Sequence, residues 1–179
     1  MLIYSGLKSQ FDKDVLSGMI GAKIEHAFYS RGLTHNNDSE FASWENSLRE
    51  MREALREKNE INNKARMIAG YCYEWISKNN PELCDIILPY GFEATWNYNN
   101  TTTWAIDAES FDQVGCIHTS QGLEFDYVGV IIGQDLRYFN GRVITDDCTT
   151  DADSIIRNTY KTLLTRGQKV AISTAKTRP

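Results

Sequence analysis

The sequence predicts an α/β fold in which helices cover the faces of a sheet. Two short runs rich in valine and isoleucine, 113–117 and 127–133, are bounded by polar turns and are typical of buried strands. Other stretches repeat apolar residues every three or four positions, as amphipathic helices do. Strands that alternate with helices favour this layered arrangement. The polar segment between the two runs would then lie at the carboxyl ends of strands, where ligands bind in open α/β sheets.

The composition is that of an ordinary soluble protein. The chain has 179 residues, a net charge of −5 and a sequence pI of about 5.2, which argues against binding nucleic acid through bulk positive charge. No apolar run is long enough for a transmembrane helix, and no secretory signal is visible. The four cysteines and three histidines form no metal-binding pattern. We therefore expect a cytoplasmic protein of one domain, or one and a half, without a metal site and without a membrane partner.

The N-terminal segment 1–60 is predicted to be mostly helical. Residues 2–4 could form a short strand, and residues 12–30 show helical spacing that two glycines weaken. The next helix can be capped by Asp38 or Ser39. Its apolar positions recur at steps of three and four, at Phe41, Trp44, Leu48, Met51 and Leu55.

A further helix is predicted over 61–78, where the same spacing continues, and a short apolar strand over 84–88. Residues 89–106 are polar but hold five large aromatic side chains, Tyr90, Phe92, Trp96, Tyr98 and Trp104. Aromatic residues on a polar loop can stack unpaired bases, or they can pin the loop onto the core. We favour the core role, because no Lys or Arg lies between them and single-strand grooves usually have such residues.

The last part of the chain predicts a hairpin, a helix and a closing strand. Asn140-Gly141 between two strand-like runs is a strong hairpin signal. Asp151 or Asp153 can cap the helix that follows, and Gly167 stands where a left-handed residue would end it. The apolar face of that helix comprises Ile155, Ile156, Tyr160, Leu163 and Leu164. Residues 169–174 form the final strand.

Two polar segments resemble helicase motifs. Residues 117–126, Ile-His-Thr-Ser-Gln-Gly-Leu-Glu-Phe-Asp, resemble motif V of the UvrD/Rep-like superfamily 1 helicases. Residues 158–167, which end in Leu-Leu-Thr-Arg-Gly, resemble motif VI. With Ala69-Gly70-Tyr71-Cys72 and Trp96-Asn97 added, residues 65–170 are similar to the Schlafen-type DNA/RNA helicase domain family, long catalogued as a domain of unknown function.

This resemblance implies a fold and a division of the chain. Residues 61–179 would form the second RecA-like lobe of the P-loop NTPase class, a three-layer sheet with helices on both faces. The helical segment 1–60 would precede it. Residues 7–12 faintly resemble motif IV, with Asp12 where the family usually has Arg, and we favour a simple loop at this place.

The resemblance also implies a nucleotide site. Arg166 would be the arginine finger of motif VI, whose planar guanidinium stabilises charge on a transferring phosphoryl group. Glu124 would accept a hydrogen bond from the nucleotide ribose, and Gly122 would let the backbone approach a phosphate. The alternatives are a cation at a helix C-terminus for Arg166 and an exposed acid for Glu124.

The residues before Gly122 are implied to line the path of a single strand and to respond to nucleotide. They are His118, Thr119, Ser120 and Gln121. The alternative for His118 is an imidazole satisfied near the end of a strand. For the two hydroxyl residues the alternative is hydrogen bonding within the turn.

The sequence lacks two parts that phosphoryl transfer needs. It holds no Gly-x-x-x-x-Gly-Lys-Ser/Thr phosphate loop and no strand that ends in a paired Asp-Glu to hold Mg²⁺. We therefore expect ATP and Mg²⁺ to bind only when a lobe with the Walker A and B motifs, here called the Walker-bearing lobe, completes the site. That lobe would be a partner, in the same chain or in another subunit, and single-stranded DNA or RNA would be the other partner. A second hypothesis is a non-catalytic module that binds nucleic acid or a helicase and regulates it.

Overall fold

The computed structural model describes residues 2–5, 37–88, 91–97, 103–139, 142–145 and 150–175. Its elements in chain order are β1 (Leu2–Ser5), α2 (Asn37–Asn62), β2 (Ala65–Ala69), β3 (Ile86–Leu88), β4 (Phe92–Ala94), the 3-10 helix η2 (Ala108–Asp112), β5 (Val114–Gly115), β6 (Phe125–Ile132), β7 (Leu136–Phe139), β8 (Arg142–Thr145), α3 (Thr150–Leu164) and β9 (Gly167–Ala175). The predicted helix over 12–30 and the motif IV-like segment 7–12 lie outside the described residues.

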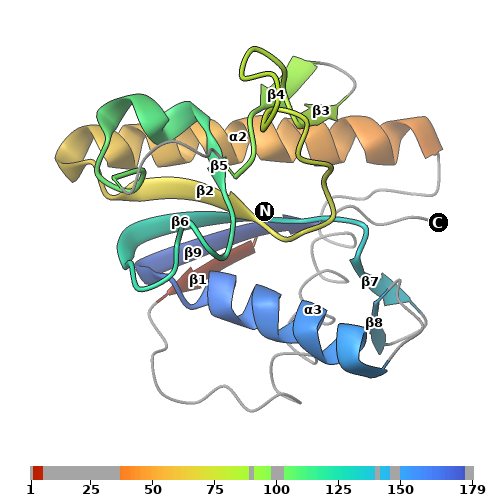
Figure 1. Cartoon of the computed structure of the whole chain (residues 1–179). Helices are drawn as coiled ribbons and strands as arrows, with labels where there is room; N and C mark the ends of the chain where they lie inside the picture. Colours follow the sequence, from red (N-terminus) through yellow and green to blue (C-terminus); the bar gives the residue numbers. More distant parts are fainter. Residues whose placement is uncertain are drawn as a thin grey trace.

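Five strands form the central sheet, in the order β1-β9-β6-β2-β5 (Figure 1). Strands β5, β2, β6 and β9 run parallel, and β1 is an antiparallel strand at the edge. The strands predicted at 127–133, 169–174 and 2–4 are confirmed as β6, β9 and β1, whereas the run 113–117 yields only the short β5. The second half of β6 is buried because helices cover both faces, which explains its unbroken apolar sequence.

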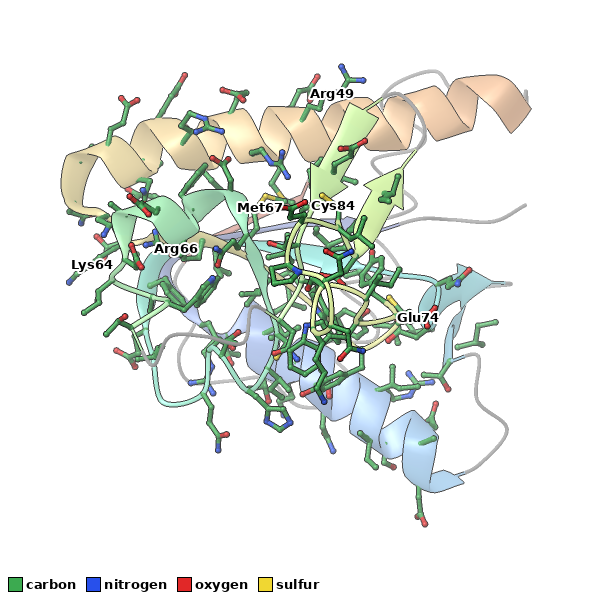
Figure 2. The ribbon with its side chains drawn as sticks, turned by 45° about the horizontal axis from the view of Figure 1, so that its top comes forward. Arg49, Lys64, Arg66, Met67, Glu74 and Cys84 are labelled. Atoms are coloured by element: carbon green, nitrogen blue, oxygen red, sulfur yellow. The ribbon has the colours of Figure 1, made fainter. Side chains whose placement is uncertain are left out.

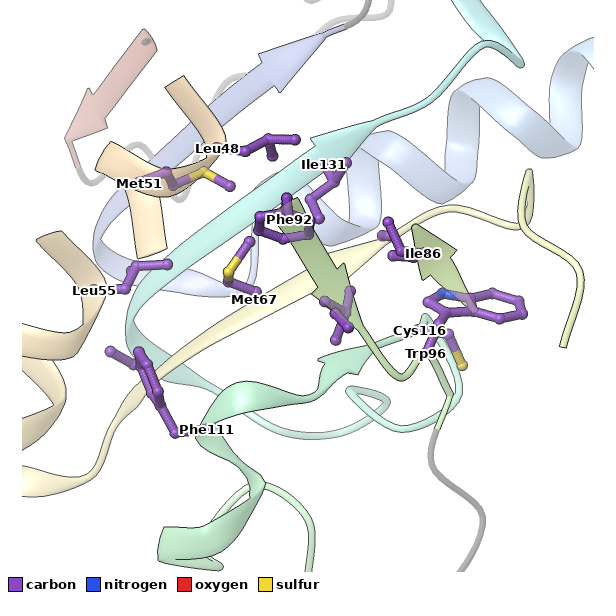
Figure 3. Packing of buried hydrophobic residues seen from close by; sticks show 14 residues of the cluster. Leu48, Met51, Leu55, Met67, Ile86, Phe92, Trp96, Phe111, Cys116 and Ile131 are labelled. Carbon is purple, nitrogen blue, oxygen red and sulfur yellow. The ribbon is translucent and has the colours of Figure 1, made fainter. Parts of the chain in front are cut away.

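Helix α2 covers one face of the sheet (Figure 1). Leu48, Met51 and Leu55 recur at steps of three and four and are fully buried, as predicted. Figure 3 shows these side chains directed at Met67 of β2 and Ile131 of β6. The apolar stripe of α2 therefore builds one of the three layers.

Helix α3 covers the opposite face and leads directly into β9. Tyr160 and Leu163 are fully buried against the sheet, which confirms that part of the predicted apolar face. The prediction for Ile155 is wrong, because its side chain is 63% exposed. Ile155 lies one position before the row of Ile156, Tyr160 and Leu163, whose spacing of four and three keeps them on one side of the helix. The two helices give the α/β fold its layers, as the sequence predicts.

Both predicted ends of α3 need correction. The helix begins at Thr150, so Asp151 and Asp153 lie within its first turn and do not precede it. The Asp153 carboxylate instead accepts a hydrogen bond of 2.9 Å from Arg157 one turn later, which lowers the pKa of Asp153. Gly167 is the first residue of β9, in register with a residue of β6, and so is not a left-handed cap.

The helix predicted over 61–78 is wrong. Helix α2 ends at Asn62, and residues 65–69 form β2 in the middle of the sheet. Asn63 has a left-handed backbone angle, with φ of 55°, which turns the chain out of the helix. All five residues of β2 are buried between β6 and β5, so strand pairing overrides the helical spacing of the sequence.

The remaining predictions about the fold are mostly confirmed. The hairpin around Asn140-Gly141 is present as the antiparallel pair β7 and β8, and the strand predicted over 84–88 is β3, paired with β4. Phe92, Trp96 and Trp104 are buried, which confirms their role in the core, while Tyr90 and Tyr98 lie outside the described residues.

Over the ranges described, no helix is long and apolar enough to cross a membrane. A domain boundary near residue 60 would fall inside α2 and stays a prediction.

A buried arginine joins three elements at the amino ends of the strands. Arg66 of β2 has no exposed surface, and its guanidinium nitrogens donate hydrogen bonds of 2.7–3.2 Å. The acceptors are Asn59 Oδ1, Asn63 Oδ1, Ser110 Oγ and the carbonyls of Ala65 and Asp107. Burial lowers the pKa of Arg66 to about 10, so the side chain still carries its charge at pH 7. Figure 2 shows Arg66 and Lys64 near the end of α2, with Glu74 on the opposite side of the molecule.

Candidate functional site

The motif V-like loop, residues 116–124, connects β5 at the edge of the sheet to the central strand β6 and runs from the carboxyl side of the sheet to its amino side. It leaves β5 after Gly115, which is the register partner of Ile68 in β2. Ile68 is in turn the register partner of Val130 in β6, so Gly115 and Val130 lie at the same height along the strands. It enters β6 at Phe125, five residues before Val130 along that strand. At about 3.3 Å per residue, the loop therefore spans roughly 16 Å between the carboxyl side and the amino side of the sheet. The start of the loop therefore lies at the carboxyl side of the sheet, and its end lies at the amino side beside Arg166.

Hydroxyl groups hold the first turn of this loop. Thr119 Oγ1 accepts a hydrogen bond of 2.7 Å from the Cys116 N–H, and Ser120 Oγ donates one of 2.9 Å to the Cys116 carbonyl. Ser120 is fully buried and Thr119 is partly buried. These contacts are the local turn bonding that the sequence left open as the alternative. The two hydroxyl groups shape the loop, and Ser120 is not at its surface.

His118 lies at the carboxyl side of the sheet, exposed on the same turn. Its imidazole meets the ring of Tyr71, with ring centroids 5.7 Å apart and an angle of 61° between the planes. Tyr71 follows the end of β2 and also meets Trp96 edge-on, at 5.6 Å and 89°. His118 is thus one member of an aromatic group that comes from three separate segments.

Gln121, Gly122 and Glu124 form the exposed second half of the loop. The Gln121 N–H donates to the His118 carbonyl at 3.2 Å, which closes the turn. Gly122 has a φ of +76°, a left-handed angle that side chains disfavour, and a Cβ built there would meet no atom within 4 Å. The glycine is therefore required by backbone conformation, and the backbone at this position lies open to a ligand.

Arg166 lies beside the end of the same loop. Its carbonyl accepts a hydrogen bond of 3.0 Å from the Phe125 N–H, and Gly167 is the register partner of Phe125. Glu124 directly precedes Phe125, so Arg166 and Glu124 both lie at the amino ends of the neighbouring strands β6 and β9. The Arg166 Nε is buried and has no hydrogen-bond acceptor among the described residues. The structure thus groups Arg166 with residues 122–124 and leaves His118 at the other end of the loop.

Three residues at the His118 end were not predicted as site residues. Tyr71 is placed on a helix by the spacing of the sequence, whereas it follows β2 in the structure. Cys116 is buried, and its thiol donates to Asn97 Oδ1 at 2.8 Å. Asn97 has a left-handed φ of 57°, which turns its amide toward the loop. The only signal for them in the sequence is that Tyr71 and Asn97 belong to the short segments that resemble the helicase family.

A tightly packed cluster around Tyr160 of α3 anchors this helix to the segments that follow β2 and β6. The Tyr160 hydroxyl donates to Asp135 Oδ1 at 2.6 Å and accepts from the Gly133 N–H at 3.1 Å. Cys72 lies against Gly133, and burial raises the pKa of its thiol to about 12, so the thiol stays neutral. Burial also raises the pKa of Asp135. Cys72 is therefore a packing residue without nucleophilic character.

We expect Gly133→Ala to destabilise the fold, because its new Cβ would overlap the Cys72 sulfur. Overpacking of this kind costs roughly 1–3 kcal/mol of the free energy of unfolding. Cys72→Ala removes the sulfur, so the double variant should recover most of that loss. Urea denaturation of the two single variants and the double variant measures the coupling between the sites. Additive losses would show that the two residues do not compete for space.

Metal chemistry has no candidate in the described part of the chain, where no group of three or more His, Cys, Asp or Glu side chains could hold an ion. Cys72, Cys84 and Cys116 are free thiols.

Comparisons with known proteins identify the family of the chain. The model of the Schlafen group 3 DNA/RNA helicase domain matches residues 29–172. The uncharacterized protein YPL245W of Saccharomyces cerevisiae is 28% identical over 93 residues, which cover 49% of this chain. The chain spans about 20% of that relative's length. No solved structure matches the chain significantly. The family match covers most of the sequence, and the chain therefore belongs to the Schlafen group 3 DNA/RNA helicase domain family.

Proposed function

We propose that the chain acts as the second, RecA-like lobe of a nucleic-acid-dependent ATPase and supplies Arg166 as an arginine finger. The observation that carries this proposal is the hydrogen bond between the Phe125 N–H and the Arg166 carbonyl. It brings the end of the motif VI-like segment beside the end of the motif V-like loop. Membership of a DNA/RNA helicase domain family supports a helicase-related role.

The nucleotide would be held at the amino ends of β6 and β9. The Arg166 guanidinium would approach the γ-phosphate, where its planar donors match phosphate oxygens. Glu124 would accept a hydrogen bond from a ribose hydroxyl, and the open backbone at Gly122 would pass close to a phosphate. The exposure of Gly122 and Glu124, and the buried Arg166 Nε without an acceptor among the described residues, fit such a ligand.

The nucleic acid would lie across the turn that runs from His118 to Gln121. His118 and Gln121 are exposed and would contact the strand, while Thr119 and Ser120 would keep the loop in shape through their bonds to Cys116. Because one loop joins both ends, a movement caused by the strand would reach Gly122 and Glu124 directly.

The chain would need a Walker-bearing lobe to complete the site. That lobe would supply the phosphate loop and the carboxylate for Mg²⁺, which are most of what phosphoryl transfer requires. It would be part of the same native polypeptide or of a partner subunit. The intact mass of the native species, compared with 20.4 kDa for this chain, distinguishes these two arrangements.

The experiment that tests the proposal is reconstitution. ATP hydrolysis is measured for the chain alone, for the Walker-bearing lobe alone and for the two combined, each with and without single-stranded DNA or RNA. We expect hydrolysis stimulated by a strand only in the mixture. A mixture no faster than the Walker-bearing lobe alone would contradict the role in catalysis.

The second candidate is a non-catalytic module that binds nucleic acid or a helicase. The exposed side chains of Tyr71 and His118 favour it, because they lie away from Arg166 and could contact a ligand without any nucleotide. It predicts binding of single strands, or of the partner lobe, without any increase in hydrolysis. The reconstitution experiment therefore separates the two candidates.

A further inference from the structure

An aromatic surface lies beyond the carboxyl ends of β2 and β5, away from Arg166. Because Ile68 of β2 pairs with Gly115 of β5, the segments that follow these strands emerge side by side. They place Tyr71 against His118, and Trp96, which follows β4, meets the Tyr71 ring edge-on. The three rings come from positions far apart in the sequence, so the fold itself assembles this group.

Tyr71 presents its ring at the surface while its hydroxyl end is held. The side chain is 45% exposed, whereas Trp96 beside it is only 3% exposed. Burial of the hydroxyl and the neighbouring Cys116 thiol raise the pKa of Tyr71. The Cys116 thiol is itself fixed by its hydrogen bond to Asn97. A ring that is already fixed loses little conformational entropy when a flat ligand stacks on it.

No cation is recorded over the rings of Tyr71 or His118 in the described residues. In this part of the chain, lysine and arginine side chains lie over five different rings, those of Phe92, Phe111, Tyr127, Trp104 and Trp75. Glu74, which follows Tyr71 closely, is exposed and acidic. The surface therefore offers an aromatic ring and no cation, so it would contact a base only, and the phosphates of a strand would have to be bound by residues elsewhere.

We propose that the exposed ring of Tyr71, flanked by His118, forms a platform on which one unpaired base of single-stranded DNA or RNA stacks. This inference rests on the proposed function, because it adds a base-binding position to the His118 end of the motif V-like loop. It also predicts that binding at this position depends weakly on salt, since stacking neutralises no phosphate.

The test measures the dissociation constants of fluorescent oligothymidine and oligouridine, each about 12 nucleotides long, within the range of single-strand site sizes. Tyr71→Ala is expected to raise the constant roughly 5- to 100-fold, because it removes the stacking surface. Tyr71→Phe keeps the ring and should stay within about threefold of the wild type. His118→Ala should weaken binding less than Tyr71→Ala does. A loss with one oligonucleotide alone supports the platform and assigns it to that type of strand.

Leu83→Ala is the matched control, because Leu83 lies in the segment that follows Tyr71 and has the same exposed fraction, 45%. It should leave the affinity unchanged. The slope of log Kd against log salt should be equal for wild type and Tyr71→Ala, since no cation is lost. Photo-crosslinking of an iodouridine oligonucleotide should label a peptide that contains Tyr71 or His118.

Several results would overturn the platform. Unchanged affinity of Tyr71→Ala for both oligonucleotides would do so, whatever the effect of His118→Ala, while leaving the motor proposal intact. Crosslinks elsewhere in the chain would have the same consequence. If Tyr71→Ala weakened binding to the Walker-bearing lobe but not to the oligonucleotides, the rings would be a protein contact and the platform would be rejected. A wild-type chain that binds neither oligonucleotide, alone or with that lobe, would overturn both proposals.

Discussion

Replacing Arg166 by alanine is expected to lower strand-stimulated ATP hydrolysis in the reconstituted pair of lobes by about 10³- to 10⁵-fold, the usual contribution of an arginine finger. The reason is that charge developing on the transferring phosphoryl group would lose a bidentate donor. Binding of a single strand should change little, because Arg166 lies at the opposite end of the loop from His118. The measurement is the single-turnover rate of ATP cleavage with saturating oligonucleotide.

Two control variants make this result specific. Arg166→Lys keeps the charge but loses the planar fork, so most of the rate should still be lost. Arg56→Ala removes an exposed arginine that pairs with Asp112 at 2.8 Å, and it should leave the rate unchanged. Thermal unfolding should show Arg166→Ala to be folded, since its Nε has no acceptor among the described residues. A normal rate in Arg166→Ala would exclude the finger role.

Replacing Arg66 by methionine is expected to cause the largest loss of stability, about 3–5 kcal/mol of the free energy of unfolding, as when one partner of a buried charged network is removed. The substitution would remove all the hydrogen bonds that the guanidinium donates, although Asn59 Oδ1, Asn63 Oδ1 and the Asp107 carbonyl each keep another donor. Any buried acceptor left unsatisfied adds about 1–3 kcal/mol to the loss. These acceptors come from the end of α2, from β2 and from the segment around η2, so all three should loosen together. Urea denaturation followed by circular dichroism measures the loss.

Arg56→Met is the matched control for this prediction. It makes the same change at an arginine whose side chain is 41% exposed and whose ion pair is with an exposed carboxylate. Such surface pairs contribute under about 1 kcal/mol. Equal losses in the two variants would mean that the Arg66 network contributes no more than a surface pair. Should Arg66→Met fail to fold, Asn59→Ala removes a single acceptor of the same guanidinium and should give a smaller, measurable loss.

The elements that sequence predicts best are those whose local signals agree with their surroundings. The hairpin follows from Asn140-Gly141, and β6 from a continuous apolar run. The stripe of α2 follows from the spacing of Leu48, Met51 and Leu55. In these cases turn chemistry, periodicity and burial all favour the same structure.

Strand β2 could not be predicted because its local signals disagree with its environment. The spacing over 61–78 suits a helix, but the left-handed Asn63 and the pairing of β2 between β6 and β5 decide the structure. Pairing between distant strands is invisible in a short window of sequence. The same error hides Tyr71, which is placed on a helix face when it in fact follows the end of a strand.

The site shows a similar division. The identities of Gly122, Glu124 and Arg166 follow from resemblance to helicase motifs, but their proximity does not follow from sequence. It results from the parallel register of β6 and β9, in which Phe125 is paired with Gly167. The inward turn of Thr119 and Ser120 is likewise a property of the folded loop. Sequence could name these residues but could not say which of them are exposed.

The most direct test of the proposed motor role is the affinity between this chain and the Walker-bearing lobe, measured with ADP and with ADP plus aluminium fluoride. Aluminium fluoride mimics the phosphoryl group in transfer, so an arginine finger binds the mimic more tightly than it binds ADP alone. We predict at least a roughly tenfold increase in affinity for the wild-type chain, equivalent to about 1.4 kcal/mol, and no increase for Arg166→Ala. Equal affinity of the wild-type chain in both nucleotide states would contradict the claim that Arg166 completes the site.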